Sequence, residues 1–297
     1  MLKRILRQNA IAFVVIILSF ILVGMMLYYA DEQIYKYFDL YYGHPHITPF
    51  MIRPIAISII SFALFLCLIL LITYSNIKKF KKIILAQKAI IYALAKLTEL
   101  RDLKTGQHLE RTTRYAIILA QQLQKNKKYS KIITNDFIED LTDAAFLHDI
   151  GKVGIRDSIL LKQDKLTPDE IKEMQKHAQI GKQELDRIIK KFHLTESFLK
   201  MASNICGYHH EKYDGTGYYR GLKKNQIPIE ARIFALADTY DTIRSARPYK
   251  PALSHRDAIK KITQDKGKYF DPDIVDAFLQ CEQEFLQISK QNSEPQM

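Results

Sequence analysis

Five of the nine histidines lie after residue 100 beside other potential metal ligands: His108, His148, His177, His209 and His210. In FLHDIGKVGI, His148 is followed directly by Asp149. Such a pair can serve two metal ions, because the imidazole binds one ion while the carboxylate bridges to the next. For the dipeptide alone, the more common interpretation is a polar pair at the end of a helix.

An aspartate in a different segment adds to these candidates. In ARIFALADTYDTI, Asp238 ends an apolar run, where a buried carboxylate needs a partner. Histidine and carboxylate ligands suit iron, manganese, cobalt, nickel or zinc, and no paired cysteines suggest a structural zinc site. His44, His46, His193 and His255 have no such neighbours and are interpreted mainly as surface residues.

Spacing connects some of these residues. Lys152 follows His148 by four residues, which places both side chains on one face of a helix. In YHHEKYDGTGYYRG, His209 and His210 are adjacent. Adjacent side chains point about 100° apart on a helix and to opposite faces of a strand, so these two rings do not share a face.

The elements that must position these residues are predicted to be helices. No alternating pattern bounded by hairpin turns occurs after residue 100, so no sheet is expected. Thr167 with Glu170, Ser254 with Asp257, and Pro272 after Asp271 are typical helix starts. An apolar repeat through Leu141, Ala144, Ala145 and Leu147 predicts a helix that stops near Gly151.

Two uncharged apolar segments, 10–29 and 55–74, are each long enough to cross a bilayer. A cleaved signal peptide is the alternative for the first, but its apolar run is too long and its cleavage site is poor. Lysines and arginines flank the two segments on the sides away from the loop 31–54. The positive-inside rule therefore predicts a membrane hairpin over 1–74, in the inner membrane, with both termini in the cytoplasm.

Residues 75–100 lack glycine and proline and are expected to form a helical linker. Apolar residues at heptad spacing predict a seam for a parallel homodimer: Phe80, Ile83, Ile90, Leu94 and Leu97. The alternative is a simple helix that packs on the downstream domain. A domain over 101–287 and a flexible tail over 288–297 complete the predicted organisation.

The distribution of charge and the cysteines argue against a nucleic-acid-binding protein and a disulfide-stabilised protein. The net charge is +12, but the excess is mostly scattered lysine without a stacking platform, so nucleic acid is not an expected partner. Cys67, Cys206 and Cys281 are far apart and fit a reducing compartment.

The order of the candidate ligands resembles the HD-GYP family of cyclic di-GMP phosphodiesterases. Four blocks carry the resemblance: LHDIGKVGI, HHEKYDGTGYYRGL, IPIEARIFALADTYDTI and RPYKPA. Several spaced blocks in one order are far more specific than a single His-Asp dipeptide. Over residues 90–285, the resemblance implies an all-α HD-superfamily domain with a two-metal site.

The family's roles then fall on particular residues. The resemblance implies two divalent transition-metal ions, iron or manganese, one held by His108, His148, Asp149 and Asp238, the other by Asp149, His177, His209 and His210. Adjacent histidines can reach one ion from a bent backbone. Asp149, which would bridge the ions, and Lys152, which would neutralise charge on the phosphoryl oxygens, are the implied catalytic residues.

The resemblance also implies that a cyclic dinucleotide is bound by Asp102, Lys152, Gly217, Tyr218, Arg247 and Lys250. A plain packing role for the Tyr218 ring remains an alternative. The expected reaction is hydrolysis of cyclic di-GMP to linear pGpG, with slow conversion to GMP at most. The alternatives are an HD-type phosphohydrolase of another nucleotide, or a dinucleotide-binding protein that signals without turnover.

Two positions depart from the family pattern. Lys104 replaces a glutamate that binds a third metal in some members, so no third metal is expected. Tyr219 replaces the proline of Gly-Tyr-Pro, which removes a φ constraint and restores a backbone N–H. This change affects the expected substrate fit of the loop, or its contact with diguanylate-cyclase-type partners.

Overall fold

The computed structural model describes residues 22–41 apart from 27, 35 and 38, and then 48–101, 107–245 and 251–291. In these ranges the chain is helical and no strand occurs, which confirms the all-α prediction. The chain divides into two compact units, Met1–Ile84 and Leu85–Met297. Each unit is described by itself.

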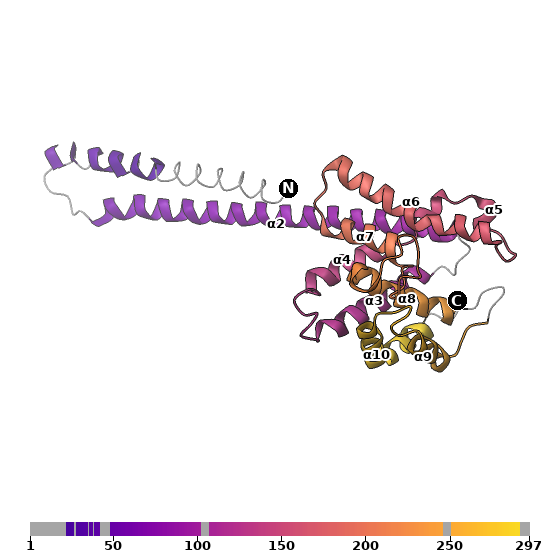
Figure 1. The fold of residues 1–297 in the computed structure, drawn as a ribbon. Helices are drawn as coiled ribbons and strands as arrows, with labels where there is room; N and C mark the ends of the chain where they lie inside the picture. Colours follow the sequence, from indigo (N-terminus) through magenta and orange to yellow (C-terminus); the bar gives the residue numbers. More distant parts are fainter. Residues whose placement is uncertain are drawn as a thin grey trace. The chain divides into compact units, whose positions relative to one another are not determined.

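The first unit contains helical residues between 22 and 41 and the start of α2 (Thr48–Arg101), the long helix labelled in Figure 1. Within the described residues, one helix is long and apolar enough to cross a membrane, Ile57–Arg101, with a mean hydropathy of 2.7 in its most apolar window. The predicted span 55–74 falls on α2, whereas the predicted span 10–29 lies mostly outside the described residues. The predicted helix over 75–100 is confirmed as part of α2, which also includes the predicted span 55–74.

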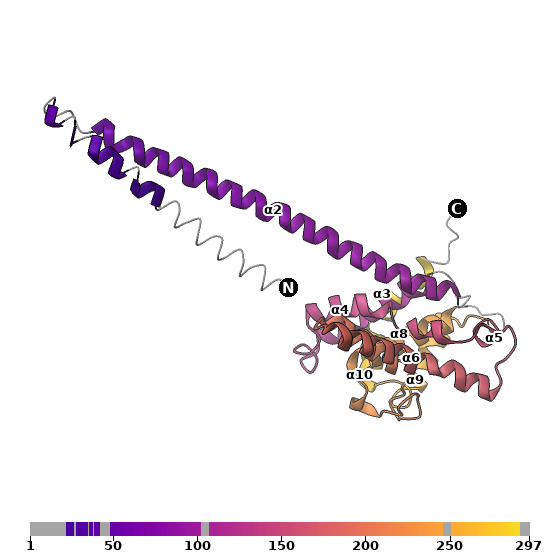
Figure 2. The ribbon, with the colours of Figure 1, turned by 90° about the horizontal axis from the view of Figure 1, so that it is seen from above.

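The second unit is a bundle of helices that also includes the last turns of α2 (Figures 1 and 2). Its elements are α3 (His108–Gln124), α4 (Asn135–Ala145), η1 (Ile150–Gly154), α5 (Asp157–Leu160), α6 (Pro168–Phe192), α7 (Ser197–Tyr208), η2 (Lys224–Gln226), α8 (Ile229–Arg244), α9 (His255–Gln264) and α10 (Pro272–Gln291). Helix α6 packs on α7 and η1, while α3 packs on α4, α8 and α10.

The predicted helix starts are confirmed. Thr167 and Glu170 form a capping box at the start of α6, the Ser254 hydroxyl accepts a hydrogen bond from the Asp257 N–H, and α10 begins at Pro272. The predicted helix stop near Gly151 is wrong, because α4 already ends at Ala145. The chain turns there, and the short 3₁₀ helix η1 brings Gly151 against the backbone of α6.

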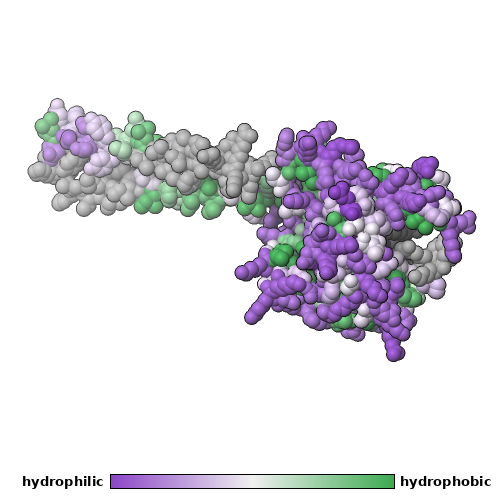
Figure 3. Space-filling model, in the orientation of Figure 1, coloured by the Kyte–Doolittle hydropathy of each residue, from purple (hydrophilic) through white to green (hydrophobic). Residues whose placement is uncertain are grey.

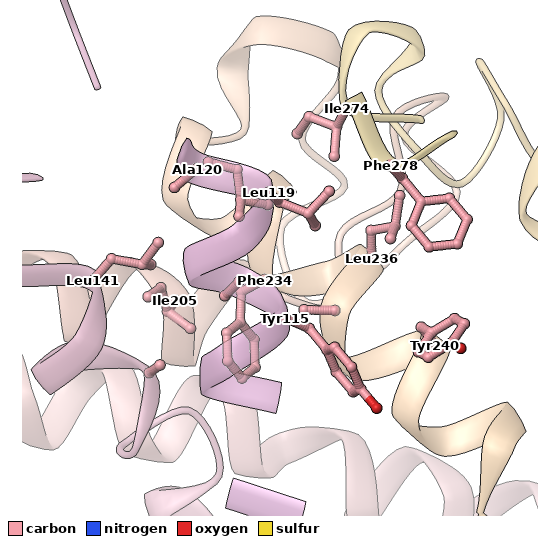
Figure 4. Packing of buried hydrophobic residues seen from close by; sticks show 14 of the residues in the cluster. Tyr115, Leu119, Ala120, Leu141, Ile205, Phe234, Leu236, Tyr240, Ile274 and Phe278 are labelled. Atoms are coloured by element: carbon pink, nitrogen blue, oxygen red, sulfur yellow. The ribbon is translucent and has the colours of Figure 1, made fainter. Parts of the chain in front are cut away.

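The core of the second unit is mainly aliphatic, with an aromatic cluster between α3, α8 and α10 (Figure 4). The Tyr115 ring stacks on Phe285 at 4.5 Å between centroids and meets the edge of Tyr240 at 5.1 Å. Phe234 and Phe278 are also fully buried. Hydrophilic residues cover most of the face of this unit that Figure 3 shows. Because α3 packs on α8, polar side chains of these two helices also lie close to one another.

Candidate metal centre

The structure gathers all seven predicted metal ligands into one part of the second unit. Their positions on the helices explain this. His108 is the first residue of α3, His177 lies in the middle of α6, and Asp238 lies on α8. The remaining ligands lie where helices end: His148 and Asp149 between α4 and η1, and His209 and His210 directly after α7.

Asp149 lies at the centre of this arrangement. Its Oδ1 is 3.3 Å from His177 Nε2 and 3.8 Å from His209 Nε2. Its Oδ2 is 3.2 Å from His148 Nε2 and 2.7 Å from Lys152 Nζ. The potential ligands thus form two groups that share this carboxylate: Asp149, His177, His209 and His210, and His108, His148 and Asp149. In each group the ligand atoms lie within 4.8 Å of one another.

Three of the histidines present an unprotonated nitrogen to this carboxylate. Nδ1 of His148 is 3.0 Å from the Ala145 carbonyl, Nδ1 of His177 is 2.7 Å from the Met174 carbonyl, and Nδ1 of His209 is 2.8 Å from the Ile205 carbonyl. A carbonyl only accepts, so each neutral ring carries its proton on Nδ1.

The other nitrogen of each of these rings is the one that faces Asp149. The three Nε2 atoms are buried and have no hydrogen-bond partner among the described residues. A lone pair that faces a carboxylate oxygen is repulsive unless a cation lies between them. The residues therefore fit a divalent metal, with the backbone carbonyls fixing each ring as outer partners do at known metal sites.

Burial keeps the imidazoles of His177, His209 and His210 in the form that binds metal. It lowers the pKa of His209 to about 3 and also lowers that of His177, although Asp149 opposes the shift in both. The pKa of His210 is likewise well below its ordinary value because of burial and the neighbouring histidines. At neutral pH the rings are neutral, as a metal ligand must be.

Asp238 meets the second group from α8, with its Oδ1 3.3 Å from His108 Nε2. Asp241, one helical turn later, holds the other nitrogen of His108 at 2.8 Å and receives two hydrogen bonds from Arg111, at 2.6 and 2.9 Å. Burial opposes ionisation of Asp241, but the hydrogen bonds from Arg111 and His108 outweigh it and lower the pKa of the carboxyl. The sequence prediction missed Asp241; its spacing of three residues from Asp238 was the available signal.

Two glycines allow the backbone around Asp149 to approach α6. A Cβ at Gly151 would lie 2.5 Å from Gly181 N and still closer to the His177 carbonyl oxygen. A Cβ at Gly181 would in turn clash with Cys206 Sγ. This close contact brings Asp149 within reach of His177, and the sequence prediction missed both glycines.

The loop after His210 is held by a buried carboxylate that was also missed. Glu211 accepts hydrogen bonds from the N–H groups of Arg220, Gly221 and Leu222 at 2.7, 3.1 and 3.0 Å. The Tyr218 ring stacks on His210, with centroids 4.7 Å apart. Gly217 lies so close to the backbone of residues 210–212 that a Cβ would clash with it. The Tyr219 ring is parallel to that of Tyr208, with centroids 6.1 Å apart.

Several other predicted positions are not described. Asp102, Lys104, Arg247 and Lys250 lie outside the described residues, as do His44 and His46. His193 is exposed at the end of α6, as expected. The surface interpretation of His255 is wrong, because its ring is held between the Tyr240 hydroxyl and Glu282.

Comparisons with known proteins show the family to which the chain belongs. The HD domain family matches residues 93–274. A protein of Vibrio cholerae named probable cyclic di-GMP phosphodiesterase is 47% identical over 204 residues, which cover 69% of this chain and 46% of that protein. A second, named cyclic di-GMP phosphodiesterase, is 48% identical over 200 residues, which cover 67% of this chain and 40% of the relative.

A third protein of the same organism, named 3'3'-cGAMP-specific phosphodiesterase 2, is 34% identical over 73% of this chain and 39% of its own length. The chain thus spans less than half the length of these three relatives. The expected resemblance to cyclic di-GMP phosphodiesterases is confirmed, and the chain belongs to the HD domain family.

Proposed function

We propose that the protein hydrolyses cyclic di-GMP to linear pGpG with the help of two divalent ions, iron or manganese. The observation that carries this proposal is the position of Asp149, whose two oxygens face different histidines. A carboxylate shared by two groups of ligands is what a two-metal phosphodiesterase needs. The names of two relatives, both cyclic di-GMP phosphodiesterases, agree with this substrate.

In this proposal the two ligand groups share Asp149, with one ion held by His108, His148, Asp149 and Asp238, the other by Asp149, His177, His209 and His210. When bound, such ions polarise a phosphodiester and lower the pKa of bound water. The chain itself would contribute the ammonium of Lys152, which is nearly buried and 2.7 Å from Asp149. Next to a phosphodiester, this charge would stabilise the oxygens on which negative charge develops.

The substrate contacts are proposals of the same kind. The Tyr218 ring, stacked on His210, would lie beside the bound dinucleotide and pack against a guanine. Gly217 would let the loop approach the substrate closely. Asp102, Arg247 and Lys250 would contact the base and the phosphates. With Lys104 in place of a glutamate, a third ion is not part of the proposal, and GMP should accumulate far more slowly than pGpG.

The test is product analysis with the purified full-length chain in detergent, loaded anaerobically with iron or with manganese. We expect loss of cyclic di-GMP with matching formation of pGpG, and a decrease of at least 100-fold for His148→Ala. Equal and negligible turnover of the wild type and His148→Ala would reject the enzyme. If the wild type alone still bound the dinucleotide, a signalling protein without turnover would be favoured.

A second candidate substrate is another cyclic dinucleotide. The observation that favours it is the relative named 3'3'-cGAMP-specific phosphodiesterase 2. The two substrates should therefore be offered separately and in competition. A kcat/KM for 3'3'-cGAMP above that for cyclic di-GMP would replace the proposed substrate without changing the reaction.

We also propose that the protein is a two-span inner-membrane protein with its catalytic domain and both termini in the cytoplasm, and that it forms a parallel homodimer through α2. The long apolar α2 supports the membrane proposal. Ile83, Ile90, Leu94 and Leu97 are all more than half exposed and follow a heptad spacing, which supports the dimer. Crosslinking of single cysteines at 90 and 94 in membranes tests the seam, with 88 as the control on another face. Equal crosslinking at all three positions would argue against it.

A further inference from the structure

The last turn of α2 contacts both backbone segments that carry the second ligand group. Helix α3 begins with His108, while η1 directly follows Asp149 and contains Lys152. Helix α3 follows α2 after a short connection, whereas Lys152 of η1 is 51 positions away from Arg101 in the sequence. Two residues of α2, Glu99 and Arg101, make the contacts.

Glu99 caps α3 from outside that helix. The first N–H groups of a helix need acceptors, and the residue at the N-cap position, Gln107, makes no side-chain cap bond. Instead, Oε1 of Glu99 accepts a hydrogen bond from the Leu109 N–H at 3.2 Å. Glu99 is 5% exposed, and a carboxylate at this end of a helix is also favoured by the helix dipole. The first turn of α3, which carries His108, is thus held by α2.

Arg101 of α2 holds the C-terminal end of η1. Its guanidinium donates to the carbonyls of Val153 at 2.8 Å and Ile155 at 3.1 Å, and pairs with Asp157 at 2.7 Å. These carbonyls lie at the C-terminal end of η1, where a helix leaves acceptors unsatisfied and attracts cations. Arg101 therefore fixes the segment whose other end carries Asp149.

We propose that Glu99 and Arg101 are positioning residues, which set the geometry of the metal centre by fixing the start of α3 and the end of η1 to α2. This inference rests on the proposed two-metal function. Partners outside the ligand sphere typically change metal affinity 10- to 100-fold. Because only His108 depends on Glu99, whereas Arg101 holds the segment of the shared Asp149, the two residues should affect metal binding differently.

The test is titration of the metal-free full-length chain in detergent with Mn²⁺, followed by calorimetry and by the spin-resonance signal of the bound ions. We expect Glu99→Ala to weaken one of two Mn²⁺ equivalents about tenfold or more, and Arg101→Ala to weaken both. Glu99→Gln, which keeps an acceptor for the Leu109 N–H, should recover most of the loss. Melting temperatures and circular dichroism identify any variant that fails to fold.

The matched control is Lys88→Ala. Lys88 is on the same helix and pairs with Asp143 of α4 at 3.0 Å, away from the ligands. The Lys88→Ala variant should bind Mn²⁺ with the affinity of the wild type. Wild-type affinity in both Glu99→Ala and Arg101→Ala, or an equal loss in Lys88→Ala, would overturn the proposal. Since no nucleotide is present, a wild type that never hydrolyses cyclic di-GMP would reject the proposed function while these affinities still test the positioning role.

Discussion

Replacement of Gly151 by alanine tests whether the packing of η1 on α6 determines the metal centre. Its Cβ would lie 2.5 Å from Gly181 N, while ordinary contacts begin at 3.4 Å, a shortfall of 3.4 − 2.5 = 0.9 Å. This atom and the His177 carbonyl oxygen, which is closer still, are backbone atoms of α6. Backbone atoms cannot rotate away as a side chain can. The segment must therefore move, and Asp149 lies only two residues before the substituted position.

The shortfall is large compared with what a metal site tolerates. A functional site must hold its groups within about 0.5 Å, and a misplacement of about 1 Å can cost 100-fold in rate. We therefore expect Gly151→Ala to weaken Mn²⁺ binding about 10- to 100-fold, and to lower the free energy of unfolding by about 1–3 kcal/mol through overpacking. Calorimetric titration with Mn²⁺ and chemical unfolding of the full-length chain measure the two effects.

Gly154→Ala is the matched control in the same 3₁₀ helix. A Cβ at Gly154 would lie 3.1 Å from the Cγ2 atom of the Ile180 side chain, which can shift by a few tenths of an ångström. Neither glycine has a positive φ, so alanine itself is compatible with both backbones. Gly154→Ala should bind Mn²⁺ within about twofold of the wild type. Equal metal affinity and equal stability of the two variants would refute the argument that this glycine contact sets the position of Asp149.

Three further predictions concern other parts of the site. Asp241→Asn should destabilise the protein by about 3–5 kcal/mol, measured by urea unfolding, because it leaves the buried Arg111 guanidinium without its carboxylate. Tyr219→Pro should cost about 0.5–1.5 kcal/mol by loss of the stacking on Tyr208, with turnover of cyclic di-GMP retained. The metal-free protein should lose stability as the pH falls from about 6.5 towards 3. In this range His209 is protonated in the unfolded state but stays neutral in the folded state, where burial lowers its pKa to about 3. Unfolding at several pH values should show a slope of about 1.4 kcal/mol per pH unit for this residue.

The ligand set was predictable because several spaced sequence blocks resemble a known family in the same order. The residues alone left a polar pair at a helix end as the more common interpretation of His148 and Asp149, and the resemblance of several ordered blocks to a known family implied the full set. The structure places His108 Nε2 3.3 Å from Asp238 Oδ1, although 130 positions separate the two residues. The helix starts were predictable for another reason: Thr167 and Ser254 cap their helices through bonds to residues three positions later. Such local bonds are encoded in a few adjacent residues.

The supporting contacts were not predictable because they depend on tertiary packing. Helix α4 ends at Ala145, since the chain must turn for Gly151 to reach α6. A pattern of apolar residues along the segment contains no information about that contact. Asp241 and Glu99 look like ordinary polar residues of their helices until Arg111 and the start of α3 are placed beside them.

The loop with the altered motif shows why a substitution in a signature need not disturb the site. Tyr219 stands where the family pattern has proline, yet the loop is held by Glu211, whose carboxylate binds three consecutive backbone N–H groups. These N–H groups belong to Arg220, Gly221 and Leu222, so the anchor does not use the backbone of residue 219. Because Glu211 directly follows His210, the same residue ties the loop to the predicted ligands. Removal of Glu211 should therefore harm turnover more than any change at Tyr219.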